Sequence, residues 1–186
     1  MKQYRVAILG ASGAVGQEMM KILAERKFPV GELHLLASAR SAGKVVSRQG
    51  QNIALEEATD AAFSGMDIVL GAAENDIAEH FAPAIVRSGA VFVDNSSAFR
   101  LDPNVPLVVP EINADHIRLI DQQRKRLGTK RGFVAVKSNC SLQSYVPALH
   151  PLLKYGLDKA LVCTYQAISG AGKTFDRMPE IVDNVI

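Results

Sequence analysis

The sequence has no tryptophan and only two cysteines, Cys140 and Cys163, among its 186 residues. Two cysteines cannot form the disulfide framework of a small secreted domain, and nothing in the sequence has the ligand spacing of a zinc site. We therefore expect no bound metal. No apolar run approaches the ~20 residues that span a bilayer, and the first residues lead into a strand-like segment without a signal-peptide layout. These absences favour a protein of the reducing cytoplasm.

The sequence also lacks a large excess of charge of either sign. The formal net charge is only +2, which does not by itself indicate a nucleic-acid or membrane partner. One local basic segment, Arg118 to Arg131, lacks the interleaved aromatic residues of a nucleic-acid surface. We interpret it as a solvated loop and predict neither nucleic-acid nor membrane binding.

Strand-like and helix-like segments alternate along the chain, which predicts βαβ units and a mostly parallel, doubly wound sheet. The expected strands are 5–9, 33–36, 68–72, 91–93, 107–109 and 133–136, and the expected helices are 14–26, 77–88, 114–123 and 141–153. A β-rich run over 160–168 begins a different architecture. The fold class is therefore α/β: a Rossmann-like domain over residues 1–137, followed over 138–186 by the beginning of an incomplete α+β catalytic domain.

A glycine-rich segment between the first strand and the first helix is typical of a dinucleotide-binding turn. Small residues there let the backbone approach a pyrophosphate, and the helix N-terminus favours its charge. The spacing is G-x-x-G-x-x-G rather than G-x-G-x-x-G, so a purely structural tight turn is the alternative. The candidate cofactor residues are Gly10, Ser12, Gly13, Ala14, Val15 and Gly16.

The end of the second expected strand favours NADP over NAD. An NAD site usually offers a carboxylate there for the ribose hydroxyls, whereas this segment, residues 37–44, contains none. Arg40, with Ser38 and Ser41, can instead hold a 2′-phosphate. A solvated basic loop is the alternative interpretation.

Cys140 stands where an expected strand ends and an expected helix begins. The positive end of a helix dipole favours the thiolate, which is the nucleophilic form of cysteine. A buried structural cysteine is the alternative. A nucleophilic thiol together with a dinucleotide indicates aldehyde oxidation or acyl reduction through a thioester.

Two further segments follow expected strands. Arg100 ends a polar segment after the strand at 91–93 and can present a bidentate fork to phosphate or carboxylate, although a surface arginine is the alternative. Gln166 offers amide groups to a substrate, and Ser169 and Gly170 allow close approach of a cofactor. A plain strand-to-turn transition would give the same pattern.

Together these segments resemble one family. The motifs, in order, are GASGAVG, LASARSAGK, VDNSSAFR, VPLVVPEIN, SNCS and TYQAISGAG. In this order and spacing they are similar to aspartate-semialdehyde dehydrogenase. The resemblance implies an NADP-dependent homodimer that converts L-aspartyl 4-phosphate to L-aspartate 4-semialdehyde and phosphate, on the way to lysine, threonine and methionine. It implies that Cys140 is the nucleophile, Arg100 binds phosphate and Gln166 contacts substrate. It also implies cofactor contacts at Ser12 to Val15, Arg40, Ser41, Ser169 and Gly170.

The sequence departs from that family in its length. Members carry a histidine general base and a further substrate-binding arginine in a C-terminal part that has no counterpart here, and none of His34, His80, His116 and His150 stands in the family's histidine motif. We therefore expect a truncated chain with impaired activity. The alternatives are an enzyme like N-acetyl-glutamyl-phosphate reductase, or a catalytically silent NADP-binding or redox-sensing module.

Overall fold

The computed structural model describes residues 2–48, 50–168, 175–176 and 178–182. The chain divides into two compact units, Met1–Gln143 and Ser144–Ile186. The division lies close to the expected boundary between residues 137 and 138, and the roles assigned to the two parts stay predictions. Among the described residues, no helix combines the length and the apolar character that a membrane span needs.

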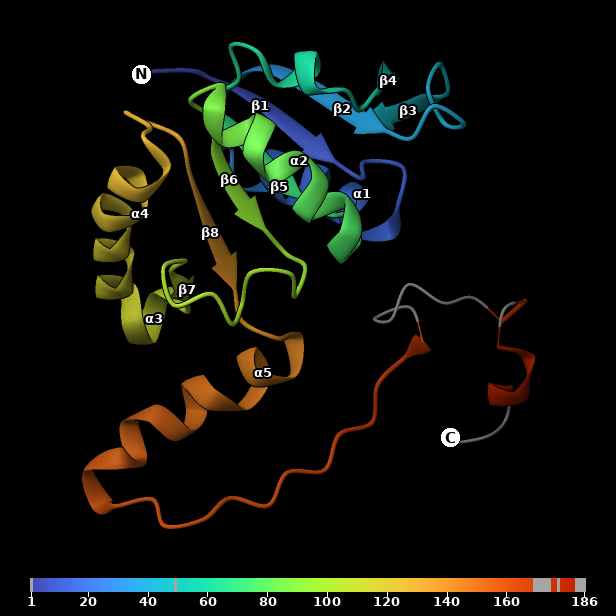
Figure 1. The fold of residues 1–186 in the computed structure, drawn as a ribbon. Coiled ribbons are helices and arrows are strands. Elements are labelled where there is room, and N and C mark those ends of the chain that lie inside the picture. Colours follow the sequence, from blue (N-terminus) through green and yellow to red (C-terminus); the bar gives the residue numbers. More distant parts are fainter. Residues whose placement is uncertain (1, 49, 169–174, 177, 183–186) are drawn as a thin grey trace. The chain divides into compact units, whose positions relative to one another are not determined.

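The first unit is built on an eight-stranded sheet with the order β3-β4-β2-β1-β5-β6-β8-β7 (Figure 1). The strands are β1 Tyr4–Leu9, β2 Val30–Ala37, β3 Val45–Arg48, β4 Gln51–Glu57, β5 Ile68–Gly71, β6 Val91–Asp94, β7 Leu107–Val108 and β8 Phe133–Lys137. Every neighbouring pair is parallel except β3 and β4. The strand order reverses direction at β1, so the predicted doubly wound, Rossmann-like α/β fold is confirmed.

Helices α1 and α2 cover opposite faces of this sheet (Figure 1). The helices are α1 Ala14–Glu25, α2 Asn75–Arg87, α3 Pro110–Asn113, α4 Leu119–Leu127 and α5 Cys140–Leu149. Short 3-10 turns occupy Asp60–Phe63, Ala114–Arg118, His150–Tyr155 and Pro179–Ile181. The predicted helix over 114–123 is therefore a 3-10 turn followed by α4, and the predicted helix over 141–153 ends as an α-helix at Leu149, because Pro151 cannot continue the ladder of hydrogen bonds.

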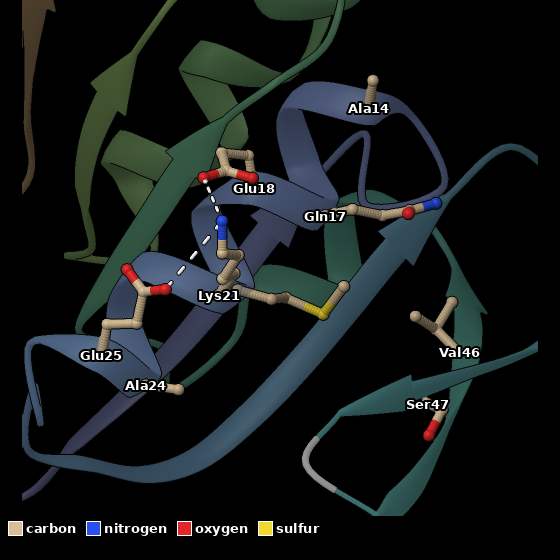
Figure 2. A pocket seen from close by; sticks show the side chains of 9 residues that line it. Ala14, Gln17, Glu18, Lys21, Ala24, Glu25, Val46 and Ser47 are labelled. Carbon is tan, nitrogen blue, oxygen red and sulfur yellow. Dashed lines mark hydrogen bonds and ion pairs between the residues drawn. The ribbon is translucent and has the colours of Figure 1, made fainter.

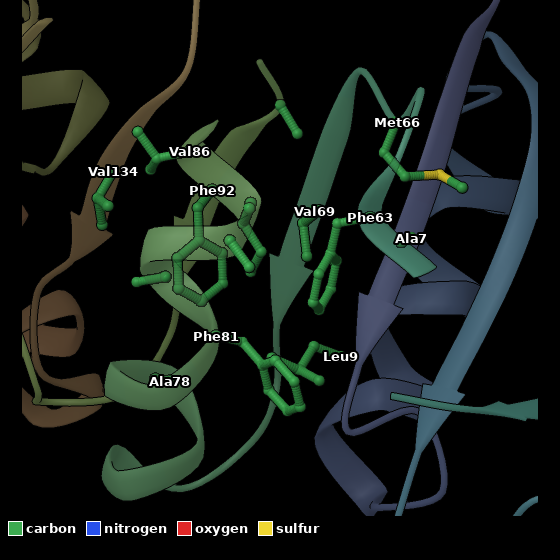
Figure 3. Close-up of a cluster of buried hydrophobic side chains, with 14 of the residues drawn as sticks. Ala7, Leu9, Phe63, Met66, Val69, Ala78, Phe81, Val86, Phe92 and Val134 are labelled. Atoms are coloured by element: carbon green, nitrogen blue, oxygen red, sulfur yellow. The ribbon is translucent and has the colours of Figure 1, made fainter. Parts of the chain in front are cut away.

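The core follows from the alternation of side chains along β1. Ala7 and Leu9 belong to the cluster under α2, where Phe81 packs with Phe63 and Phe92 is fully buried (Figure 3). Ile8 points the other way, into a second cluster that includes Met20 of α1. Both faces of the central strands are therefore apolar, as parallel strands between two helical layers require.

Two features of the fold were not predicted correctly. No strand was predicted between β2 and β5, but Val45–Arg48 and Gln51–Glu57 form an antiparallel hairpin whose second strand adds to β2. The β-rich run over 160–168 is not a strand: residues 157–167 have no regular structure, and all of them are exposed. No strand of the described sheet pairs with this run, although its composition favours β-structure.

The side chain of Gln123 completes the edge of β8. Gln123, on α4, has no exposed surface. Its Oε1 accepts a hydrogen bond from the Val134 amide at 2.7 Å, and its Nε2 donates to the carbonyl oxygens of Val134 and Asn104 at 3.0 and 2.9 Å. On this side β8 pairs with β7 only at Val136 and Lys137. Gln123 thus replaces a missing strand and fixes the strand that leads to Cys140.

Replacing Gln123 by leucine should lower the free energy of unfolding by about 2–4 kcal/mol, because it leaves buried backbone groups without partners. Urea unfolding followed by circular dichroism measures this loss. Gln122→Leu, a change at the exposed neighbouring position, is the matched control and should shift stability by less than about 1 kcal/mol. Equal unfolding midpoints for the two variants would contradict the role assigned to Gln123.

Candidate functional site

The ends of four parallel strands define one edge of the sheet. Leu9, Gly71, Asp94 and Val136 are register partners across β1, β5, β6 and β8. The loops that follow these residues therefore all begin at the carboxyl edge, where ligands bind in open α/β sheets. The glycine-rich turn follows β1 and Cys140 follows β8, so the two strand ends that lead to them are three strand spacings, or roughly 14 Å, apart.

Close packing explains the glycines of the turn. Gly10 has a φ of +87°, and a Cβ there would lie 2.7 Å from the Ala72 carbonyl oxygen. A Cβ on Gly16 would lie 2.6 Å from the Gly10 carbonyl oxygen, whereas one on Gly13 meets nothing closer than 3.5 Å. Gly16 is thus needed to bring α1 against the end of β1, and Gly10 lets the end of β1 approach the chain that follows β5. Gly13 is free to serve a ligand.

The exposed part of the turn fits an anionic group. Ser12, Gly13, Ala14 and Val15 are all exposed. Helix α1 begins at Ala14, and no side chain of the described residues caps it at Gly13. The first amides of a helix without a side-chain cap, together with the helix dipole, form a favourable site for phosphate.

The loop after β2 lies beside this turn, because the Gly10 and Ala11 amides both donate to the Leu36 carbonyl oxygen, at 2.9 and 3.0 Å. The Ser41 amide donates to the Ser38 carbonyl oxygen at 2.8 Å, which closes the loop into a turn. Arg40 and Ser38 are exposed on it and Ser41 is partly exposed. A guanidinium and two hydroxyl groups are therefore available at the end of β2, as a 2′-phosphate would require.

Buried polar groups shape the segment after β6. Asp94 is 1% exposed, and its carboxylate accepts hydrogen bonds from the Ser96 amide, at 3.1 Å, and from the Ser96 hydroxyl. Asn75, at the start of α2, accepts from the Ser97 amide at 3.0 Å. The Asn95 amide donates to the Gly71 carbonyl oxygen at 3.1 Å. The segment is therefore held to the ends of β5 and α2.

These bonds position Arg100. Its Nε donates to the Lys137 carbonyl oxygen at 3.2 Å, and its Nη2 donates to the Asn95 carbonyl oxygen at 3.0 Å. The side chain is half-buried. A guanidinium has more N–H groups than these two bonds use, so Arg100 can still bind an anion at the end of β8.

Cys140 is exposed in the structure. It is the first residue of α5. The side-chain Oδ1 of Asn139 accepts from the Ser141 amide at 2.8 Å, which is the bond of an N-capping residue. The thiol thus stands at the capped N-terminus of the helix, as predicted, and a ligand can reach it.

Lys137 was missed by sequence reasoning. It is the half-buried last residue of β8, and its Nζ donates to the Ser138 carbonyl oxygen at 3.1 Å. Burial lowers its pKa, the nearby positive charge of Arg100 lowers it further, and the negative charge of Cys140 acts in the opposite direction. A lysine ending an otherwise apolar strand three positions before the thiol was the available signal.

The remaining predicted site residues belong to the second unit. Gln166 is exposed in the second unit, and Ser169 and Gly170 lie outside the described residues. His34 contacts Glu56 at 2.9 Å, and His116 contacts the Leu107 carbonyl oxygen at 2.9 Å. Within the described residues there is also no cluster of side chains suited to a metal ion.

A separate pocket of about 490 Å³ lies between α1 and β3 (Figure 2). Its charged residues belong to α1, where Lys21 pairs with Glu18 at 3.2 Å and with Glu25 at 3.9 Å. Ala14, the first residue of α1, is at its rim, but Arg40 and Cys140 do not line it. These charged side chains pair with one another on the surface of α1. We therefore assign the pocket no part in the site.

Comparison with known proteins shows what this chain is similar to. A family model described as semialdehyde dehydrogenase, NAD binding domain, matches residues 5–120. Aspartate-semialdehyde dehydrogenase of Bacillus subtilis is 46% identical over 169 residues, which are 90% of this chain and 45% of that protein. The chain thus spans about half the length of such relatives.

Two solved structures show the same fold. Aspartate semialdehyde dehydrogenase II of Vibrio cholerae, complexed with ASA, is 38% identical with a TM-score of 0.73; the match covers 82% of this chain and 47% of that one. The Candida albicans enzyme, solved with NADP, is 28% identical with a TM-score of 0.64, covering 83% of this chain and 48% of that one.

Gly16→Ala should lower the free energy of unfolding by about 1–3 kcal/mol, because the added Cβ overlaps backbone atoms that cannot move independently. Gly13→Ala is the matched control within the same turn and should cost less than about 1 kcal/mol. Urea unfolding of the two variants measures the difference. A Gly16→Ala variant as stable as Gly13→Ala would show that the turn does not pack as described.

Asp102 fixes the segment that follows Arg100 in the sequence. Its Oδ1 accepts from the Asn104 amide at 2.8 Å and from the Asn104 side chain at 3.0 Å, and its Oδ2 lies 3.3 Å from Nη2 of Arg126 on α4. The hydrogen bond from the Asn104 amide is the main cause that lowers the Asp102 pKa below 3.8, and the Arg126 contact adds to it. The carboxylate therefore stabilises the fold above that pH, and its contribution disappears as pH falls through the lowered value.

The stability of the protein should therefore fall more steeply between about pH 5 and pH 3 than that of an Asp102→Asn variant, which lacks the titrating group. Urea unfolding at several pH values gives both slopes. Asp121→Asn, at a side chain 84% exposed, is the control and should keep the slope of the unmodified protein. Identical slopes for Asp102→Asn and the unmodified protein would show that the carboxylate contributes nothing.

Proposed function

Because the chain belongs to the semialdehyde dehydrogenase family, we propose that it carries the cofactor turn and thiol nucleophile of an NADP-dependent aspartate-semialdehyde dehydrogenase. The reaction is the reductive dephosphorylation of L-aspartyl 4-phosphate to L-aspartate 4-semialdehyde, a step toward lysine, threonine and methionine. The observation that carries this proposal is the exposed Cys140 at the start of α5, beside a strand end to which Arg100 is bonded. A cytoplasmic location and a homodimeric assembly stay predictions.

The residues present fit a dinucleotide. The backbone amides around Ser12 to Val15 would face the pyrophosphate, since these residues are exposed while Gly10 and Gly16 pack closely against backbone atoms. Arg40, with Ser38 and Ser41, would bind the 2′-phosphate of NADP, a group that the Candida albicans relative was solved with. Bound NADPH would supply the hydride. Ser169 and Gly170 stay predicted cofactor contacts.

The chemistry of this chain begins with Cys140. Its thiolate attacks the acyl carbon of aspartyl phosphate, so that a carbon–sulfur bond forms and the carbon–oxygen bond to phosphate breaks. Phosphate leaves with the electron pair of that bond, and the Arg100 guanidinium neutralises its charge. After reduction of the thioester, the carbon–sulfur bond breaks, which releases the aldehyde and returns the thiolate. Gln166 is the proposed contact for the rest of the substrate.

The described residues place no histidine base beside the thiol, and a positioned base typically adds ~10²–10⁴-fold in rate. We therefore propose slow turnover for the 186-residue chain. Under this proposal the nucleophilicity of the Cys140 thiol depends on the positive end of the α5 dipole and on neighbouring cations.

Cys140→Ser should abolish NADPH oxidation that depends on aspartyl phosphate, with a loss of at least ~10³-fold from the activity of the unmodified chain, because the hydroxyl is a much weaker nucleophile. Absorbance at the NADPH band measures the rate. Cys163→Ser, which removes the other exposed thiol, should leave it within about twofold.

The same assay separates the alternatives. Faster turnover of N-acetyl-glutamyl phosphate than of aspartyl phosphate would favour the related reductase. Binding of NADPH with no turnover of either acyl phosphate would favour a silent module. Equal loss of activity in Cys140→Ser and Cys163→Ser would remove the special role of Cys140.

A further inference from the structure

A pocket of about 280 Å³, here called the α2–α4 pocket, is lined by residues of α2, α4, β8 and the segment after β6. Neither Arg100 nor Cys140 lines it. Its apolar side chains are those of Ala82, Val86, Phe99, Val105, Leu127 and Val134. Val86 and Val134 belong to the core cluster drawn in Figure 3. Leu127 is 44% exposed, so part of this apolar surface is open to a ligand.

Charged side chains of both signs also line the α2–α4 pocket. Glu79 and Arg87 come from α2, Asp102 comes from the segment after β6, and Arg126 comes from α4. Two carboxylates and two guanidinium groups have no net charge together. The pocket therefore does not favour a ligand with a large charge of one sign, whereas a ligand that carries one charge of each sign finds a partner for both.

Asp102 and Arg126 place two opposite charges side by side at this pocket. Oδ2 of Asp102 lies 3.3 Å from Nη2 of Arg126, and the two side chains are 30% and 47% exposed. Oδ1 of Asp102 accepts both hydrogen bonds from Asn104, which leaves Oδ2 to face a ligand. A carboxylate oxygen accepts more than one hydrogen bond, and a guanidinium has five N–H donors, so the pair can bind further groups.

We propose that the α2–α4 pocket binds a free α-amino acid with an apolar side chain. The ammonium and carboxylate of such a molecule are bonded to one carbon, so they too stand side by side. Oδ2 of Asp102 accepts from the ammonium, Arg126 donates to the carboxylate, and the apolar side chain lies against Val86, Val105 and Val134. The volume suits a ligand somewhat larger than benzene, which fills a cavity of roughly 150 Å³. This site goes beyond the proposed function and does not depend on it.

Ligands of other chemistry use fewer of these groups. A carboxylate with an apolar tail but no ammonium sets its negative charge beside Asp102 without compensation. An apolar amine sets its positive charge beside Arg126 in the same way. An uncharged apolar molecule displaces water from both side chains and replaces none of its hydrogen bonds. The zwitterion is the head group that satisfies both charges at once.

The test titrates the ¹⁵N-labelled 186-residue chain with L-leucine and follows its amide resonances by NMR. Saturable shifts with a Kd below about 1 mM are expected at residues 79–87, 99–105 and 126–134. Three further probes separate the parts of the ligand: 4-methylpentanoate lacks the ammonium, leucinamide lacks the carboxylate, and L-serine lacks the apolar side chain. The first two should bind about threefold to tenfold more weakly than L-leucine, and L-serine at least about tenfold more weakly.

Two variants assign each charge to its partner. Asp102→Asn should bind L-leucine and 4-methylpentanoate with affinities within about twofold of each other, because the partner of the ammonium is gone. Arg126→Met should bind L-leucine and leucinamide within about twofold of each other, because the partner of the carboxylate is gone. Asp121→Asn and Lys125→Met, at exposed positions of α4 that do not line the pocket, are the matched controls and should keep the preferences of the unmodified chain.

Several outcomes would overturn the proposal. One is the absence of saturable shifts with L-leucine up to about 10 mM. Another is equal binding of L-leucine, 4-methylpentanoate and leucinamide by the unmodified chain, a comparison that needs no variant to fold. A third is a variant that weakens all probes by the same factor, because this would indicate altered shape rather than a lost contact. Shifts confined to the Gly13 turn and Cys140 would place the ligand at the sheet edge instead.

The result is separable from that of the proposed function, since the titration contains neither acyl phosphate nor NADPH. If no acyl phosphate is turned over but L-leucine binds with the expected preferences, the proposed function fails and the amino-acid site stands. If turnover depends on Cys140 and L-leucine does not bind, the amino-acid site fails and the proposed function stands.

Discussion

The parallel pairing of β1, β5, β6 and β8 in one register is the constraint on which the site depends. Parallel strands all end at the same edge, and here Leu9, Gly71, Asp94 and Val136 form a single row. The residues that follow this row supply both the phosphate-binding turn and the thiol. The register of the sheet thus sets the distance between the strand ends that lead to the two groups.

A chain of hydrogen bonds ties the loops to this row. The Asn95 amide is held by the Gly71 carbonyl oxygen of β5, the Asn95 carbonyl oxygen holds Arg100, and Arg100 holds the Lys137 carbonyl oxygen of β8. The end of β8 is thus secured from β5 through a loop as well as through direct pairing. On its other side, Gln123 takes the place of a strand. The turn before Cys140 is consequently one of the most firmly fixed parts of this edge.

Local signals were sufficient to predict much of this arrangement. The apolar run before Gly10, the spacing of the glycines and the strand-to-helix transition at Cys140 each lie within a few residues, and the structure has the corresponding elements where they were expected. Gly10 and Gly16 also show why such a signal is readable: a side chain at either position would meet backbone atoms.

Features that depend on partners distant in the sequence could not be predicted from it. The hairpin formed by β3 and β4 was missed because its strand character depends on pairing with β2. The run over 160–168 was wrongly predicted as a strand because its composition favours β-structure, whereas no strand of the described sheet pairs with it. Lys137 was missed because its half-burial depends on the fold of the turn and on Arg100, and a lysine at a strand end is ordinarily a surface residue.

The claim that Cys140 bonds to an acyl carbon can be tested directly by mass spectrometry of the protein mixed with aspartyl phosphate and no nicotinamide cofactor. Without a hydride donor the thioester cannot be reduced and should accumulate. We expect an aspartyl adduct on the peptide that contains Cys140, removable by hydroxylamine, with one phosphate released for each adduct and no adduct on Cys163. An unmodified Cys140, or equal labelling of both cysteines, would contradict the account.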